Sequence, residues 1–182
     1  VIDPDNAGAV LRMLTGVVCL CKSPILLQTG KHMSSLGKRS NRDLIEALQQ
    51  LGVRATDLTL EGEEASWFLP MRLHGGEHLK AAFDAAPNGK LSITISGEMS
   101  SQFLSSVLFL TPLLPGTTEI KVVNGLKSKP LIRTTLEVLQ QAGIQVESAD
   151  DLESFTVQGN QRYERREWQV NGDWPGVTAV LA

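Results

Sequence analysis

The sequence has few cysteines, few aromatic residues and no long hydrophobic run. Its two cysteines, Cys19 and Cys21, lie two positions apart in an apolar segment, which is neither a zinc-ligand spacing nor a disulfide framework. We therefore expect buried structural thiols in a reducing compartment. The longest apolar stretches, 17–20 and 107–114, are shorter than the roughly 20 residues that a membrane-spanning helix needs.

Positive charge is also scarce, because 17 lysines and arginines face 20 aspartates and glutamates. No general positive field is available to hold a nucleic acid or an anionic membrane surface, so we expect neither as a partner. Any anion has to be bound at a local site. Asp3, Asp5 and Asn6 stand where a signal or transit peptide would carry basic residues, which favours a cytoplasmic protein.

The composition that remains is typical of a packed globular domain, with 42% hydrophobic and 20% charged residues. His74 and His78 could share a helix face as metal ligands only if the glycines at 75–76 were helical, which their low helix propensity opposes. The sequence contains no catalytic triad, Walker loop or dinucleotide fingerprint. We therefore expect no metal and no organic cofactor.

An internal repeat organises the chain. Residues 44–53 (LIEALQQLGV) align without a gap on residues 135–144 (TLEVLQQAGI). Both copies have apolar residues at helical spacing and a glycine where a left-handed cap would end the helix. Each copy therefore predicts a short amphipathic helix that leads into a strand.

The segments around the two copies repeat as well. A helix-like and a strand-like segment precede each copy, at 9–20 and 25–28, and at 102–114 and 119–123. Two strand candidates follow each copy, at 67–73 and 91–95, and at 155–158 and 168–170. The order helix, strand, helix, strand, strand occurs twice, which predicts two tandem α/β units rather than an open doubly wound sheet.

Small polar residues and glycines precede two helices at corresponding positions of the repeat, in 5–8 (DNAG) and in 96–102 (SGEMSSQ). Free backbone N–H groups and the positive end of the helix dipole can bind phosphate or carboxylate there. The alternative is that Asn6, Ser100 and Ser101 only cap their helices. Their equivalence in the repeat favours a common ligand.

Two basic segments are further candidates for anion binding. Residues 127–130 (KSKP) offer one hydroxyl and two ammonium groups before the second helix of the second unit. Residues 30–40 (GKHMSSLGKRS) form a basic loop in which Arg39 could hold a carboxylate or phosphate through two hydrogen bonds. A solvated charged loop is the alternative that the spacing leaves open.

Taken together, these motifs resemble those of EPSP synthases, the 3-phosphoshikimate 1-carboxyvinyltransferases. Asn6-Ala7-Gly8 followed by Arg12 is similar to the family's glycine-asparagine-alanine-glycine-threonine motif, and 96–104 closely resembles its serine-serine-glutamine-phenylalanine signature. Ser128-Lys129-Pro130, 159–163 and Gly172-Asp173 follow in the family's order. The match runs over essentially the entire chain.

The resemblance implies an α/β (α+β) fold made of tandem βαβαββ units, the enolpyruvyl transferase fold. The family has three such units in each of two domains, with the active site between the domains. Residues 1–172 would form an incomplete N-terminal-type domain, about two of the three units, at about 1–90 and 91–172. Residues 173–182 would begin the crossover to the missing second domain.

The activity that the resemblance implies is transfer of the enolpyruvyl group of phosphoenolpyruvate to the 5-hydroxyl of shikimate 3-phosphate, in the shikimate pathway of aromatic amino acid biosynthesis. The reaction proceeds by addition and elimination and needs no cofactor. The implied partners are the two substrates and the missing domain, in a monomeric cytoplasmic enzyme that glyphosate also binds. No catalytic residue falls within these residues, so we expect the chain alone to be inactive.

Residue by residue, the resemblance assigns binding roles to both substrates. Shikimate 3-phosphate is assigned to Ser100, Ser101, Gln102 and Ser128, and phosphoenolpyruvate to Asn6, Gly8, Arg39 and Gln102. Arg12 matches a family arginine with a structural or electrostatic role.

The chain departs from the family pattern at five places, which bear on its substrate affinity. Asp5 replaces a glycine, Ala9 a threonine, Ser40 a proline, Leu131 a tyrosine, and Trp174-Pro175-Gly176 a serine-rich stretch. These departures leave a diverged, non-catalytic ligand-binding paralogue as an alternative. A second alternative is the sister transferase that acts on UDP-N-acetylglucosamine, although the loop at 30–39 lacks its reactive cysteine.

Overall fold

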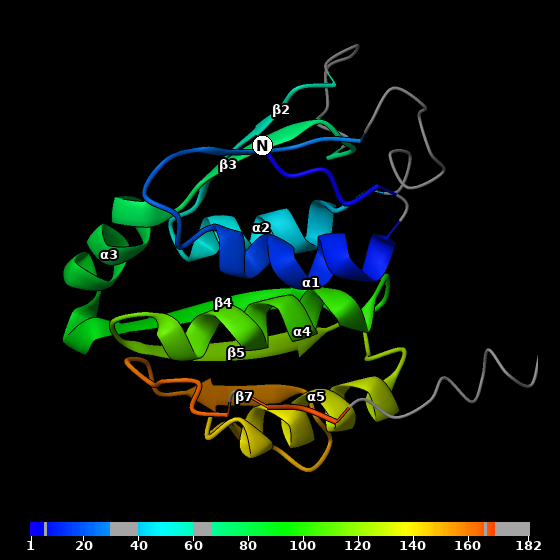
Figure 1. Ribbon diagram of the computed structural model, residues 1–182. Coiled ribbons are helices and arrows are strands. Elements are labelled where there is room, and N and C mark those ends of the chain that lie inside the picture. The colour runs from blue at the N-terminus through cyan, green and yellow to red at the C-terminus, as the bar shows by residue number, and fades with distance from the viewer. Residues whose placement is uncertain (6, 30–39, 60–66, 166, 170–182) are drawn as a thin grey trace, which may run out of the picture.

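The computed structural model describes residues 1–5, 7–29, 40–59, 67–165 and 167–169 (Figure 1). Its helices are α1 (Gly8–Val18), α2 (Arg42–Gln50), α3 (Gly76–Ala85), α4 (Ser101–Leu110) and α5 (Lys129–Gln141), with short 3-10 turns at Pro87–Gly89 and Thr111–Leu113. Its strands are β1 (Ile25–Leu27), β2 (Arg54–Asp57), β3 (Met71–His74), β4 (Lys90–Ser96), β5 (Thr117–Val123), β6 (Glu147–Ser148) and β7 (Ser154–Val157).

The strands form two sheets that share one topology. One sheet has the order β1-β3-β2 and the other β4-β5-β7-β6. β4 and β5 are parallel, while β7 is antiparallel to both β5 and β6, just as β3 is antiparallel to both β1 and β2. Ile2 forms a parallel bridge with Leu27 of β1, in the place that β4 takes beside β5. The run from β4 to β7 is therefore a βαβαββ unit, and the α/β fold with a structural repeat is confirmed.

Three details differ from the sequence-based assignment. The candidate strand at 91–95, which we placed after the first helix copy, is β4, and it pairs with β5 in the second sheet. Two short strands were missed: β2, whose residues Arg54–Asp57 carry no apolar alternation, and the two-residue strand β6. Trp168 lies outside any strand and is 43% exposed, and Val170 falls outside the described residues.

Helix α3 was also not predicted, because we judged the glycines at 75–76 to oppose a helix. Gly76 begins the helix at φ +34°, where its N–H donates to the carbonyl of Cys19 at 2.7 Å. At a first position glycine costs little helix stability and supplies the unusual backbone angle. The imidazoles of His74 and His78 consequently meet edge to face, with ring centroids 4.6 Å apart.

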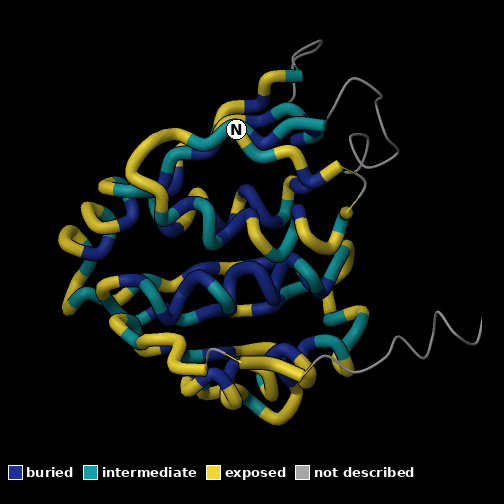
Figure 2. The backbone as a smooth tube through the Cα atoms, viewed as in Figure 1, coloured by how far each residue is buried: buried dark blue, intermediate teal, exposed yellow. Residues whose placement is uncertain are grey.

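The core lies between the helices and the two sheets (Figure 2). α4 is its central helix, because every residue of α4 except Gln102 and Phe109 is buried. On β4, Ile93 and Ile95 point inward while Ser92 and Thr94 are exposed, as expected for a sheet covered on one face. No helix among the described residues has both the length and the apolar character that crossing a membrane requires.

Helix α1 packs closely along α4. Gly16 N donates to Ser106 Oγ at 2.9 Å, and a Cβ at Gly16 would lie only 2.6 Å from the carbonyl oxygen of Ser106. One helical turn earlier, Arg12 contacts Gln102. In both pairs, Gly16 with Ser106 and Arg12 with Gln102, the two residues are 90 positions apart in the sequence. Because both contacts have the same sequence separation, α1 and α4 run parallel and in register.

The side chain of Gln50, at the end of α2, joins the two units. Its Oε1 accepts from the backbone N–H of Thr94 at 2.8 Å, and its Nε2 donates to the Thr94 carbonyl at 2.9 Å. β4 is an edge strand of its sheet. The amide of Gln50 therefore replaces a neighbouring strand at this position.

Candidate anion-binding site

Helices α1, α2, α4 and α5 all begin at the same end of the molecule, on the right in Figure 1. For α4 and α5 this follows from topology, because each begins after the carboxyl end of one of two adjacent parallel strands. Ligands of α/β proteins commonly bind at such an edge, where helix N-termini offer free N–H groups. The two helix starts that the repeat pairs are thus brought together.

Ser100 and Ser101 have different surroundings at the start of α4. Ser100 is the N-cap, and its Oγ accepts from the N–H of Gln102 at 3.3 Å, so Ser100 caps its helix; a ligand contact of the same residue stays a prediction. Ser101 is only 5% exposed, yet in the described part of the chain no group bonds to its hydroxyl. Because this hydroxyl is not engaged in a cap, Ser101 is the better candidate for a ligand contact.

Gln102 is half-buried and contacts α1. Arg12 Nη1 donates to Gln102 Oε1 at 3.2 Å, and the guanidinium carbon of Arg12 lies 5.2 Å from the ring centroid of Phe103. A cation over an aromatic face at this distance is stabilising. Sequence reasoning missed the Arg12 contact, although the 90-residue separation between corresponding points of the repeat could have indicated it.

Ser128 stands before α5, in the loop next to the one that precedes α4. The N–H of Lys127 donates to the carbonyl of Gly97 at 3.2 Å, and the N–H of Gly97 donates to Val123 at 2.9 Å. A Cβ at Gly97 would lie 2.2 Å from the carbonyl oxygen of Gly125, so only glycine permits this approach. The hydroxyl of Ser128 makes no capping bond, which leaves it available to a ligand.

The remaining predicted site residues are only partly within the described chain. Gly8 is half-buried and begins α1, while Asn6 and Arg39 lie outside the described residues. The structure therefore brings Gly8, the residues 100–102 and Ser128 to one end of the molecule. Which ligand each of them binds stays a prediction.

Two departures from the family pattern have structural explanations. Asp5 adopts φ +49°, a left-handed conformation that favours glycine but that aspartate tolerates, and its N–H donates to Asp3 Oδ1 at 2.9 Å. The Ser40 hydroxyl accepts from the N–H of Arg42 at 3.2 Å at the start of α2. Both substitutions are thus compatible with the local backbone.

Negative charge also gathers close to the site. A groove of about 440 Å³ is lined by the carboxylates of Asp43, Glu46 and Glu98. Burial raises the pKa of Asp43, and the charges of Glu46 and Glu98 raise it further, against an opposing effect of Arg42. An anion is therefore favoured on the side of α4 and α5 where the exposed Lys127 and Lys129 lie.

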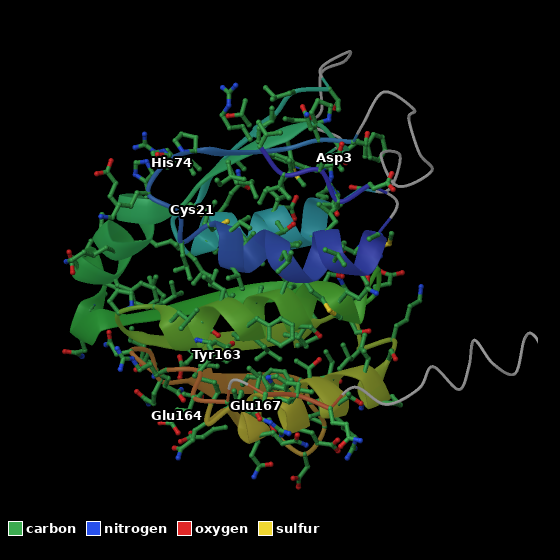
Figure 3. All side chains as sticks on the ribbon, viewed as in Figure 1. Asp3, Cys21, His74, Tyr163, Glu164 and Glu167 are labelled. Carbon is green, nitrogen blue, oxygen red and sulfur yellow. The ribbon has the colours of Figure 1, made fainter. Side chains whose placement is uncertain are left out.

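The two cysteines are not part of this site. Cys19 is buried, and desolvation followed by the nearby Cys21 raises the pKa of its thiol to about 12. Cys21 is exposed, so our expectation of two buried thiols is wrong for this residue. Figure 3 shows Cys21 and His74 at the end of the molecule opposite the helix starts.

The family comparison and the comparison with individual proteins identify the same family. The EPSP synthase (3-phosphoshikimate 1-carboxyvinyltransferase) family matches residues 1–181. A protein named 3-phosphoshikimate 1-carboxyvinyltransferase from Deinococcus radiodurans is 34% identical over 180 residues, which cover 99% of this chain and 36% of that protein. One from a Marinomonas species is 37% identical, over 97% of this chain and 37% of that protein.

A solved EPSP synthase from Acinetobacter baumannii shares the fold, with a TM-score of 0.61 at 17% identity, over 87% of this chain and 30% of that one. The chain spans a little over a third of the length of the two relatives named above. The family match extends over nearly the whole chain. This chain therefore belongs to the EPSP synthase family.

Proposed function

We propose that the protein containing this chain transfers the enolpyruvyl group of phosphoenolpyruvate to the 5-hydroxyl of shikimate 3-phosphate, and that this chain supplies part of one wall of the active site. The proposal takes residues 1–172 as most of one domain and residues 173–182 as the start of the crossover to a second. The enzyme would be a cytoplasmic monomer without a metal or organic cofactor. The chain alone, without the second domain, would have no turnover.

One observation carries this proposal: the parallel helices α1 and α4 begin side by side and are joined by the Arg12–Gln102 hydrogen bond. Two helix N-termini directed at the same region suit two anionic substrates that have to lie next to each other. Holding both substrates in a reactive orientation accounts for a large part of the acceleration in such a reaction.

In this proposal the starts of three helices bind the substrates: α4 and α5 bind one, and α1 binds the other. The hydroxyls of Ser101 and Ser128 and the amide of Gln102 would donate to the phosphate of shikimate 3-phosphate, supported by the dipoles of α4 and α5. Gly8 at the start of α1 would let backbone N–H groups approach phosphoenolpyruvate, together with Asn6 and Arg39. Lys127 and Lys129 would attract both anions.

Calorimetric titration of the full-length protein with shikimate 3-phosphate tests this assignment. Ser101→Ala and Ser128→Ala each remove a charge-assisted hydrogen bond, so each is expected to weaken binding about tenfold or more. Ser154→Ala is the matched control, because Ser154 is an exposed serine on β7. Failure of the unsubstituted protein to bind shikimate 3-phosphate would contradict the proposed function.

A second measurement tests the role of the chain as a part of the enzyme. Phosphate release is followed with both substrates present, first with the full-length protein and then with residues 1–182 alone. We expect substrate-dependent release only from the full-length protein. Substrate-dependent turnover by residues 1–182 would show that the catalytic groups lie within this chain.

A further inference from the structure

The contact between Arg12 and Gln102 determines which end of the glutamine amide faces α1. A guanidinium group has only donors, so the atom of Gln102 that faces Arg12 Nη1 at 3.2 Å has to be the carbonyl oxygen. The NH₂ end of the amide therefore points away from Arg12. In the described part of the chain no group accepts a hydrogen bond from this Nε2.

Both partners of the contact are held in place. Arg12 lies over the ring of Phe103 at 5.2 Å, and one turn further along α1 the N–H of Gly16 donates to Ser106. The backbone of Gln102 is fixed by its bond to the N-cap Ser100. The remaining freedom of Gln102 is the rotation of its own side chain.

That rotation matters at an anion site. An amide that turns its NH₂ group to a phosphate or carboxylate donates a charge-assisted hydrogen bond, whereas one that turns its oxygen is repelled. Without a fixed neighbour, the glutamine has two orientations of similar intrinsic energy. A donor beside the amide oxygen selects one of the two orientations before the ligand arrives, which lowers the conformational free-energy cost of binding.

We propose that Arg12 is a positioning residue: its guanidinium fixes the amide of Gln102 so that Nε2 is presented as a donor to the anionic substrate. This inference rests on the proposed function, and it adds a role for a residue outside the assigned substrate contacts. Arg12 acts through Gln102 and not primarily through its own charge.

A double-mutant cycle separates these two modes of action. The dissociation constant of shikimate 3-phosphate is measured for the full-length protein with Arg12→Met, Gln102→Met and both. We expect Arg12→Met to weaken binding about tenfold when Gln102 is present but less than threefold in the Gln102→Met background. An equal loss in both backgrounds would mean that Arg12 acts on the ligand by its own charge, and would overturn the proposal.

Gln102→Glu provides an independent test of the amide orientation. Its carboxylate keeps an oxygen for Arg12 but turns a second, charged oxygen to the ligand, so binding is expected to fall more than it does in Gln102→Met. If Gln102→Glu binds shikimate 3-phosphate as tightly as the unsubstituted protein, Nε2 is not the group that meets the ligand and the proposal fails.

Separate controls test whether each variant is folded and whether the proposed function itself is correct. Thermal unfolding of every variant checks that α1 remains docked, and the cycle is repeated with Arg12→Lys, which keeps the charge and a long stem. Arg12→Lys is expected to weaken binding about threefold with Gln102 present and not at all in the Gln102→Met background. A loss that persists without Gln102 overturns the proposal, whereas absence of binding by the unsubstituted protein contradicts the proposed function itself.

Discussion

Replacing Gly16 by alanine tests the packing of α1 on α4 that aligns the two helix starts. In an unobstructed helix this change stabilises a protein by about 1 kcal/mol. Here the new Cβ would lie 2.6 Å from the carbonyl oxygen and 2.9 Å from the hydroxyl of Ser106, so α1 has to move away from α4. Overpacking of this kind costs roughly 1–3 kcal/mol, and the lost bond from Gly16 to Ser106 costs about 1 kcal/mol more.

The net expectation for Gly16→Ala is a loss of about 2 kcal/mol in the free energy of unfolding, or roughly 4–8 °C in Tm for a chain of this size. Chemical and thermal unfolding followed by circular dichroism measures both quantities. Val10→Ala on the exposed face of the same helix is the control, because Val10 is 49% exposed and its truncation is expected to change stability by about 0.5 kcal/mol or less. A Gly16→Ala protein as stable as the starting protein would refute the close approach of the two helices.

Three further predictions concern other parts of the chain. Gln50→Ala is expected to lower the free energy of unfolding by about 1 kcal/mol, since two hydrogen bonds outweigh the side-chain entropy regained, whereas Gln49→Ala, at an exposed neighbour, changes it little. Burial raises the pKa of Tyr163 to about 12, so absorbance at high pH should show the single tyrosine titrating well above pH 10. Because the folded pKa lies above the unfolded one, the stability contributed by Tyr163 is full below about pH 10 and is lost as the pH rises through 12. A thiol reagent should modify Cys21 in the native protein and reach Cys19 only after unfolding, and rapid modification of both would contradict the burial of Cys19.

The helices with strong periodicity were predictable from sequence. The copies at 44–53 and 135–144 became α2 and α5 because their apolar residues fall on one helix face. β2 was not predictable, because Arg54–Asp57 is held in its sheet by pairing with β3 and not by an apolar pattern of its own. The assignment of β4 to the wrong unit has a similar cause: sequence order does not state which strands pair.

The internal repeat predicted which helix starts would form the candidate site, but it did not predict the side-chain contacts within it. Equivalent positions in two copies indicated that the helix starts near Gly8 and Ser100 would lie together, and the fold places them at one end. The Arg12–Gln102 bond was not predicted, because it depends on how closely two helices dock. That distance is decided by Gly16 and Ser106, whose small size gives no signal of function in a linear sequence.

The two hydrogen bonds between the Gln50 side chain and the Thr94 backbone also bear on how the chain evolved and folds. A duplicated supersecondary unit is often imagined as an autonomous module that was copied and strung together. Here the last turn of a helix in the first copy completes the hydrogen bonding of a strand in the second, so the second copy depends on the first for this part of its sheet. A cut of the chain at the turn at Pro87–Gly89 would accordingly leave the backbone N–H and carbonyl of Thr94, in the second fragment, without these two bonds.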